Sequence, residues 1–224
     1  MDQDGFYDAA YYDSHYGRIH SDADYYRVRS KYWRHALFEV FGIPTDGLCL
    51  DFGCGLGVVS AALDQVETYD FSPFARDFVK NKGGTVYGDP RDIADNRFDL
   101  ILSSHCLEHS LTPHEDLKRF AQWAKPNARF VLVLPVEINL KPANCYDNDR
   151  HMQTWTFQTI TNLLLASGWQ PLQQAYIYDS FALGRLTSLL GEDKAVPLAW
   201  KLGRAVRQFK SLYIISRPQT EQPA

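Results

Sequence analysis

Three side chains that can bind a metal ion or move a proton follow one another closely in the middle of the chain. His105, Glu108 and His109 have the spacing i, i+3 and i+4, and such positions share one face of a helical turn. His151, in a later Asn-Asp-Arg-His segment, is a fourth candidate. Imidazoles and a carboxylate together can hold a divalent metal ion. Without an ion, His109 or His151 can act as a general base, because a neutral imidazole near pH 7 accepts a proton from a hydroxyl or an amine.

A glycine-rich turn follows a short apolar segment, in the stretch LCLDFGCGLG. Gly53, Gly55 and Gly57 let the backbone turn sharply and approach a ligand without side-chain obstruction. The third glycine comes too early for the dinucleotide-binding fingerprint. Asp51, just before the turn, also disfavours an approaching phosphate and suits a cationic ligand instead.

A second acid ends the next predicted strand. Asp70 lies one strand-turn-helix unit after the glycine-rich turn, and a carboxylate there can accept hydrogen bonds from both hydroxyls of a ribose. The alternative interpretation of Asp70 is a local cap before the helix that Ser72 begins.

These residues resemble a known family. Asp51 to Gly57 matches the D-x-G-x-G-x-G signature of class I, Rossmann-like, S-adenosylmethionine-dependent methyltransferases, and the resemblance covers about Leu48 to Trp169. It implies that S-adenosylmethionine is the cofactor and S-adenosylhomocysteine the product. It also implies an acid that binds the adenine amino group, for which Asp89 fits best and Asp92 is second. Pro90 departs from the family pattern, because it has no N–H to donate to the adenine ring. The predicted cofactor-binding residues are Asp51, Gly53, Gly55, Gly57, Asp70, Phe71, Asp89 and Ser104.

The same resemblance bears on the histidine-rich segment. Ubiquinone-pathway O-methyltransferases and small-RNA 3′-terminal 2′-O-methyltransferases carry E-x-x-E-H here and use it for a divalent metal. This chain has His105 in place of the first Glu, which would shift the preference of a site towards softer ions. Many other relatives keep the E-H pair without a metal, with Glu108 as a structural hydrogen-bond partner and His109 lining the pocket.

The pattern of apolar residues predicts strands that alternate with helices, as in βαβ units with a mainly parallel sheet. We therefore expect an α/β fold, a Rossmann-like three-layer sandwich with seven strands, the last of them antiparallel. The predicted strands are 48–51, 66–69, 85–87, 99–103, 130–134, 172–178 and 212–216. The predicted helices are 22–41, 58–63, 73–79, 116–124 and 156–167, with a turn at Pro126-Asn127.

The sequence divides the chain into three parts. Residues 1–44 are predicted to form a helical, Tyr-rich cap. In this cap, Tyr11, Tyr12 and Tyr16 are candidates for a lid over the substrate. Residues 45–217 predict the methyltransferase domain, with a helical insertion at about 180–210 whose basic, amphipathic second helix can meet an anionic substrate, a membrane surface or a partner. Residues 218–224 predict a disordered tail.

The composition limits the partners of the protein. The formal net charge of −4 argues against a large nucleic-acid substrate. No apolar run reaches transmembrane length and the N-terminus lacks a signal-peptide core, which together favour the cytoplasm and at most weak peripheral membrane contact. The four cysteines form no C-x-x-C pair and are expected to be reduced. Either a monomer or a homodimer is compatible with the sequence.

We therefore expect an enzyme that methylates a small molecule at a hydroxyl oxygen, such as a sugar, a natural product or a quinone-like compound. The first alternative is a metal-assisted RNA-terminal or quinone O-methyltransferase. The second alternative is a cofactor-binding scaffold without catalysis.

Overall fold

The computed structural model describes residues 6–137, 143, 149–207 and 209–219, and Cys145 lies outside them. The chain divides into two compact units, Met1–Ala94 with Tyr178–Phe209, and Asp95–Ile177 with Lys210–Ala224. Residues 218 and 219 of the predicted tail are described in the structure. The N–H of Gln219 donates to the carbonyl of Gly168. The last five residues of the tail, 220–224, lie outside the described residues.

The first unit holds three parallel strands that present the glycine-rich turn. The register pairs Cys49 with Val66 and Glu67 with Thr85, so the order is β3-β2-β1. The three strands are β1 (Cys49–Phe52), β2 (Val66–Tyr69) and β3 (Thr85–Val86). All four residues of β1 are buried, as the apolar run predicts for a central parallel strand.

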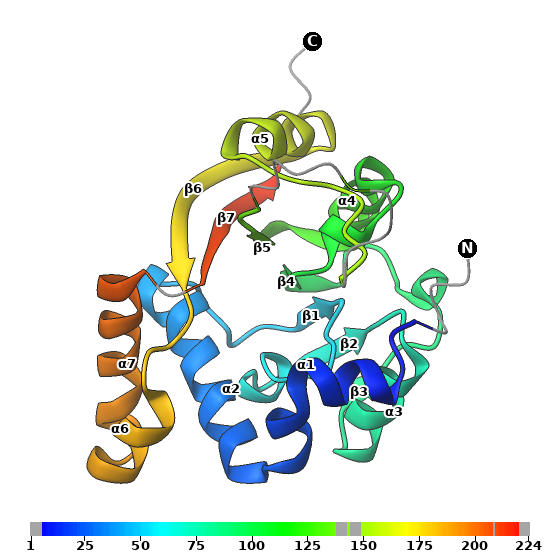
Figure 1. Cartoon of the computed structure of the whole chain (residues 1–224). Helices are drawn as coiled ribbons and strands as arrows, with labels where there is room; N and C mark the ends of the chain where they lie inside the picture. The colour runs from blue at the N-terminus through cyan, green and yellow to red at the C-terminus, as the bar shows by residue number, and fades with distance from the viewer. Residues whose placement is uncertain (1–5, 138–142, 144–148, 208, 220–224) are drawn as a thin grey trace. The chain divides into compact units, whose positions relative to one another are not determined.

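Five helices belong to this unit (Figure 1): α1 (Ala9–Ser21), α2 (Ala23–Leu37), α3 (Pro73–Asn81), α6 (Leu183–Leu190) and α7 (Glu192–Val206). Side-chain caps fix where the first three begin, since Asp8, Asp22 and Ser72 each accept a hydrogen bond from a backbone N–H three residues later. A buried cluster joins α2 to α6 and α7, with Val28, Tyr32, Ala36, Leu183, Val196 and Ala199.

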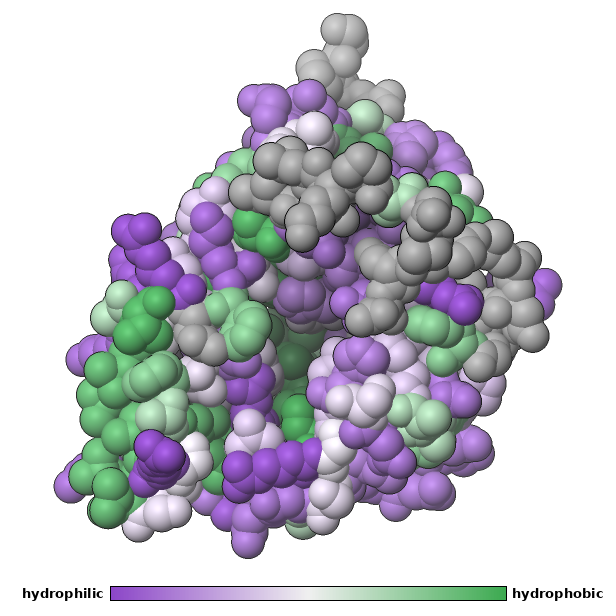
Figure 2. All heavy atoms as spheres, viewed as in Figure 1, coloured by the Kyte–Doolittle hydropathy of each residue, from purple (hydrophilic) through white to green (hydrophobic). Residues whose placement is uncertain are grey.

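The outer side of α6 and α7 is unusually apolar. Figure 2 shows a hydrophobic area over these two helices, at the lower left of the view. Leu189, Leu190, Val206 and the following Phe209 are exposed there.

The described residues of the second unit form four strands and two α-helices. β4 (Phe98–Ser104) pairs in parallel with β5 (Ala124–Pro135), and β5 pairs antiparallel with β7 (Lys210–Pro218). The remaining elements are β6 (Trp169–Tyr178), α4 (Pro113–Trp123) and α5 (Phe157–Ala166). Trp169 is fully buried against Phe130, and its indole N–H donates to the carbonyl of Leu117 at 2.8 Å.

The strand order is β3-β2-β1-β4-β5-β7-β6, and helices flank the strands. The sheet is mostly parallel, with β7 reversed. The predicted fold class, a Rossmann-like α/β sandwich with seven strands and an antiparallel last strand, is confirmed. Among the described residues, no helix has the length and hydropathy needed to cross a membrane.

Three local predictions are wrong. The single helix expected over 22–41 ends at Leu37 and is followed by a 3-10 turn, η1 (Glu39–Phe41), with Gly42 in the left-handed region at φ 63°. Asp22 caps α2 and so separates it from α1. The helix expected over 58–63 is only the 3-10 turn η2 (Ser60–Ala62), because Leu63 is extended and ends it at once.

The turn expected at Pro126-Asn127 lies inside β5 instead. In the pairing of β4 with β5, Phe98 lies opposite Ala124, but Leu100 lies opposite Arg129. The extra residues of β5 between these two pairs form a bulge. The turn-forming residues therefore produce an irregularity in the strand rather than its beginning.

Candidate functional site

The glycine-rich turn has the backbone geometry that its composition predicts. Gly53, Gly55 and Gly57 have φ values of 78°, 52° and 69°, in the left-handed region that favours glycine. A Cβ atom on Gly57 would lie 2.9 Å from Cγ2 of Val79 on α3. The turn is also tied to the end of β2, since the N–H groups of Gly53 and Cys54 both donate to the carbonyl of Tyr69, at 2.8 and 3.1 Å.

Asp51 is buried beneath this turn. Its side chain is 2% exposed and accepts a hydrogen bond from Oγ of Ser60 at 2.5 Å. Burial raises the pKa of the Asp51 carboxyl to about 7, the neighbouring Asp70 carboxylate raises it as well, and the Ser60 hydrogen bond opposes both. A carboxyl in this state gains its charge readily when a cation comes close, because an opposite charge favours the ionised form.

Asp70 holds the glycine-rich turn and the start of α3 at the same time. Its two oxygens accept from the N–H of Gly55 and the N–H of Ser72, each at 2.8 Å. Its pKa is raised because it is buried, although both hydrogen bonds and Arg76 act in the other direction. The ligand role and the capping role that the sequence left open are therefore compatible, since each carboxylate oxygen has a second lone pair.

Two tyrosines from the N-terminal helices pack on the turn. Tyr26 on α2 donates from its hydroxyl to the carbonyls of Leu56 and Gly57, at 3.0 and 2.8 Å. Tyr12 on α1 is 5% exposed and its ring stacks on Phe74 of α3. The sequence marks Tyr26 only as a candidate buried position of its helix, because nothing local signals a contact across thirty residues.

The lid candidates differ in their surroundings. Tyr12 is a core residue in this structure, whereas Tyr16 is 42% exposed and lies where α1 departs from helical geometry. The Tyr11 ring stacks on His15, with ring centroids 4.3 Å apart. Tyr11 is partly exposed, and the lid role of the three tyrosines stays a prediction.

The remaining cofactor candidates of this unit are more exposed. Asp89 begins η3 (Pro90–Asp92), where its carboxylate accepts from the backbone N–H and the guanidinium of Arg91. Asp92 is exposed. Phe71 is 38% exposed and stands edge-on to Phe52 and Tyr69. The adenine role of Asp89 stays a prediction.

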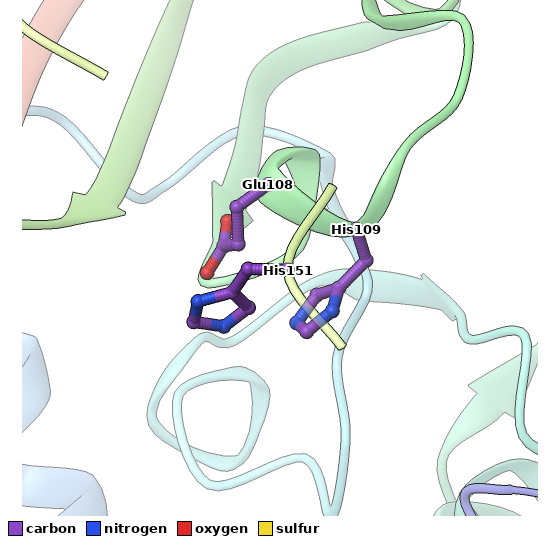
Figure 3. A group of neighbouring side chains, drawn as sticks. All are labelled: Glu108, His109 and His151. Atoms are coloured by element: carbon purple, nitrogen blue, oxygen red, sulfur yellow. The ribbon is translucent and has the colours of Figure 1, made fainter. Parts of the chain in front are cut away.

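In the second unit, Glu108, His109 and His151 come together (Figure 3). One ligand atom from each lies within 4.8 Å of the others, and the two imidazole rings meet edge to face with centroids 4.7 Å apart. Glu108 and His109 lie on η4 (Leu107–His109), a 3-10 turn rather than the predicted α-helical turn. Burial lowers the pKa of His109, against the opposing effect of the Glu108 carboxylate.

Backbone hydrogen bonds bring His151 to this turn. The N–H groups of Met152 and Gln153 donate to the carbonyl of Glu108, at 2.8 and 3.0 Å. The Nδ1 atom of His151 lies 2.6 Å from Oε1 of Glu137, just after β5. Glu137 was missed from the sequence, where a single Glu after a strand carries no signal.

His105 lies apart from this group. It has a positive φ of 52° directly after β4, and its Nε2 lies 3.2 Å from Oγ of Ser211. Its Nδ1 is 3.6 Å from Oε1 of Glu108, too far for a hydrogen bond. Ser104, the last residue of β4, is half-buried. The structure therefore brings together three of the four predicted metal ligands.

Comparison with known proteins identifies the family of the chain. A family model described as "Methyltransferase domain" matches residues 25–174, which is most of the chain. The chain belongs to this methyltransferase family. The predicted recognition, a class I S-adenosylmethionine-dependent methyltransferase, and the predicted enzyme class are confirmed at this level. No curated protein matches this methyltransferase.

Solved structures share its fold. A chain of the complex containing the Haloferax volcanii Trm112 methyltransferase activator is 16% identical, with TM-score 0.62, over 96% of this methyltransferase and 99% of that chain. Burkholderia thailandensis 1,6-didemethyltoxoflavin-N1-methyltransferase, solved with bound 1,6-didemethyltoxoflavin and S-adenosylhomocysteine, is 18% identical, with TM-score 0.58. The match covers 94% of this methyltransferase and 88% of that chain. The [4+2]-cyclase SpnF is 13% identical, with TM-score 0.56, over 86% and 80%. Since this last neighbour is named for a different reaction, the fold alone does not fix the chemistry.

Proposed function

We propose that this methyltransferase moves the methyl group of S-adenosylmethionine to a hydroxyl oxygen of a small molecule. The observation that carries the proposal is the buried Asp70 carboxylate, which directly follows β2 and fixes the glycine-rich turn through Gly55. A carboxylate at the end of a parallel strand is where nucleoside-binding α/β folds hold a ribose. Asp51, buried under the same turn, supports a cationic cofactor rather than a pyrophosphate.

The reaction needs little from the protein beyond alignment. The acceptor oxygen attacks the methyl carbon, the bond between that carbon and the sulfonium sulfur breaks with its electron pair on sulfur, and the hydroxyl proton leaves. Neutral S-adenosylhomocysteine and a methyl ether result. Holding the reacting atoms in line supplies much of the acceleration in such a transfer.

We propose that the group formed by Glu108, His109 and His151 accepts the proton that the acceptor hydroxyl loses. Burial lowers the pKa of His109, which favours the neutral imidazole, and a neutral imidazole accepts a proton. The negative net charge supports a small acceptor over a nucleic acid. The small heterocycle for which the Burkholderia neighbour is named also supports a small acceptor, although that enzyme is named for methylation at nitrogen.

Calorimetry with S-adenosylhomocysteine tests the cofactor half of the proposal. Asp70→Ala removes a carboxylate that makes charge-assisted hydrogen bonds of about 1.5–3 kcal/mol each, so binding should weaken at least about 100-fold. Asp77→Ala, on the exposed side of α3, is the matched control and should bind like the wild type. Wild-type protein that does not bind S-adenosylhomocysteine would reject the proposal.

A label-transfer screen tests the acceptor half. Cofactor labelled in its methyl group is incubated with phenols, sugars, quinol-like compounds, amines and short RNA oligonucleotides. We expect label in a hydroxyl-bearing small molecule. Transfer only to amines, or only to RNA, would contradict the assignment to oxygen or to a small acceptor.

A further inference from the structure

The Glu108 side chain is the most unusual polar group in the second unit. It is fully buried, yet neither of its carboxylate oxygens has a hydrogen-bond partner among the described residues. The Nδ1 atom of His105 is 3.6 Å from Oε1 of Glu108, which is too far for a hydrogen bond. Burying a carboxylate without a partner costs free energy that a protein normally avoids. Such a carboxylate indicates a ligand that binds to it.

Two imidazoles lie beside this carboxylate. Figure 3 shows the side chains of Glu108, His109 and His151 gathered at one place, with His151 arriving from a separate segment. Ligand atoms of one ion lie about 2.0–2.2 Å from it, so two of them are at most about 4.4 Å apart. The ligand atoms of the three residues lie within 4.8 Å of one another, so a small movement of the side chains would bring them to that distance.

The supporting contacts are those that hold a metal-binding histidine in place. Glu137 contacts Nδ1 of His151 at 2.6 Å, and a carboxylate on one imidazole nitrogen fixes the ring and raises the basicity of the other. The backbone of Arg150 bonds to His109. The carbonyl of Glu108 is held by Met152 and Gln153, so all three ligand residues belong to one hydrogen-bonded piece of backbone.

We propose that Glu108, His109 and His151 bind one divalent transition-metal ion. Two imidazoles and one carboxylate favour Zn²⁺, Mn²⁺, Co²⁺ or Fe²⁺ over Mg²⁺ and Ca²⁺, which prefer oxygen ligands. Three protein ligands leave positions open for water or for an acceptor oxygen. Glu137 is a positioning residue that acts through His151.

This inference rests on the proposed methyl transfer from S-adenosylmethionine to a hydroxyl oxygen, and it replaces the imidazole of His109 as the acceptor of the hydroxyl proton. With an ion bound, the lone pairs of both imidazoles are used, so neither can serve as the base. A bound ion would instead lower the pKa of a hydroxyl that coordinates it, so that water could take the proton. The acceptor would then be a molecule that offers its hydroxyl as an oxyanion ligand.

Metal binding by the full-length protein tests the proposal without any acceptor. Protein freed of metal with a chelator is titrated separately with Zn²⁺, Mn²⁺ and Mg²⁺, and stoichiometry and affinity are measured by calorimetry and elemental analysis. We expect one transition-metal ion per chain and much weaker binding of Mg²⁺. Glu108→Gln and His151→Gln should each weaken binding at least about 100-fold, and Glu137→Gln about 10- to 100-fold.

His114→Gln is the matched control, because His114 is outside the cluster and contacts Ser167. It should bind the ion like the wild type. Binding that survives Glu108→Gln and His151→Gln would indicate an adventitious surface histidine and overturn the proposal, as would a wild type that binds no transition metal. Because S-adenosylhomocysteine binding is measured separately, failure here is distinguishable from failure of the proposed function.

A second inference concerns the exposed apolar side of α6 and α7. Leu189 is 79% exposed and Phe209 is 76% exposed, next to half-exposed Leu190 and Val206. Residues 181–209 carry five basic side chains and two acidic ones, which gives this segment a net charge of +3. The whole chain has a net charge of −4, so the remaining residues together carry −7. Of the two acids, Glu192 already pairs with Arg27 and Lys31. The basic side chains are exposed: Arg185, Lys194, Lys201, Arg204 and Arg207.

The structure assigns this surface to an anionic lipid bilayer. Exposed apolar side chains beside exposed Lys and Arg are the features of a helix that lies in a membrane interface, and the local positive charge complements anionic headgroups. A second copy of the chain would bring together two surfaces of the same positive charge. That repulsion disfavours a dimer through this surface.

Vesicle sedimentation with the full-length protein tests this assignment. Binding to phosphatidylglycerol-containing vesicles should exceed binding to pure phosphatidylcholine and should decrease as salt is added. Leu189→Ser with Phe209→Ser, and separately Lys201→Glu with Arg204→Glu, should each weaken binding at least about tenfold. Arg91→Glu, outside the surface, is the control. Equal binding to both vesicles, binding to neither, or a dimer that Leu189→Ser dissociates would overturn the assignment.

Discussion

Replacing Asp51 with Asn is expected to remove a pH-dependent loss of stability from the protein without its cofactor. Burial raises the pKa of Asp51 from 3.8 to about 7, with a further increase from Asp70. Because the pKa is higher in the folded than in the unfolded state, the folded state binds more protons between these two values. The contribution of Asp51 to stability is therefore complete below the lower value and is lost as the pH rises through the higher one.

The size of the effect follows from the width of this window. One proton taken up on folding changes the free energy of unfolding by about 1.36 kcal/mol per pH unit. From 3.8 to about 7 is roughly three units, so the full loss is about 4 kcal/mol, of which about 3 kcal/mol falls between about pH 5 and about pH 8. Asn has nearly the same shape, and its carbonyl oxygen can still accept the hydrogen bond from Ser60.

The assay is chemical unfolding of wild type and Asp51→Asn at several pH values across this range. The free energy of unfolding of wild type relative to the variant should fall by about 3 kcal/mol from pH 5 to pH 8. Asp77→Asn, which changes an exposed acid on α3, should show no such trend. A difference between wild type and Asp51→Asn that is independent of pH would refute the argument that burial controls this carboxyl.

Three further substitutions test the packing of the cofactor turn. Tyr26→Phe deletes the hydroxyl that donates to two carbonyls of the turn, and should cost about 1–3 kcal/mol of stability and also weaken S-adenosylhomocysteine binding in calorimetry. Gly57→Ala places a Cβ 2.9 Å from Val79 at a positive φ, and should lower the free energy of unfolding by about 1–3 kcal/mol; an unchanged thermal midpoint would contradict this close approach of the turn to α3. Ser60→Ala removes the hydrogen bond that lowers the pKa of Asp51, so the pH-dependent loss of stability should extend above pH 7 in the unfolding assay.

The local features of this site could be predicted from the sequence. Glycine has no Cβ, so three glycines after a buried strand indicate a turn in the left-handed region, and Gly53, Gly55 and Gly57 adopt it. Ser72 followed by Pro73 predicted the start of α3, and Ser72 does cap it. Both predictions depend only on neighbouring residues.

The short helical turns were harder to predict. The spacing of His105, Glu108 and His109 suggested one α-helical face, but the segment forms only a 3-10 turn, and the positive φ of His105 turns it out of the group. A pattern of a few residues does not distinguish one turn of α-helix from a 3-10 turn, because the hydrogen bonds that decide between them are set by the flanking elements.

The sequence by itself determined the order of the strands, the glycine-rich turn and the acid that follows β2, because each depends on local backbone preferences and on apolar periodicity. Tertiary structure alone decided which side chains from distant segments meet. Tyr26 reaches the glycine-rich turn across about thirty residues, and the backbone of Met152 and Gln153 brings His151 beside Glu108. It also decided the chemical state of Asp51, because burial, rather than residue type, sets the cost of a charge.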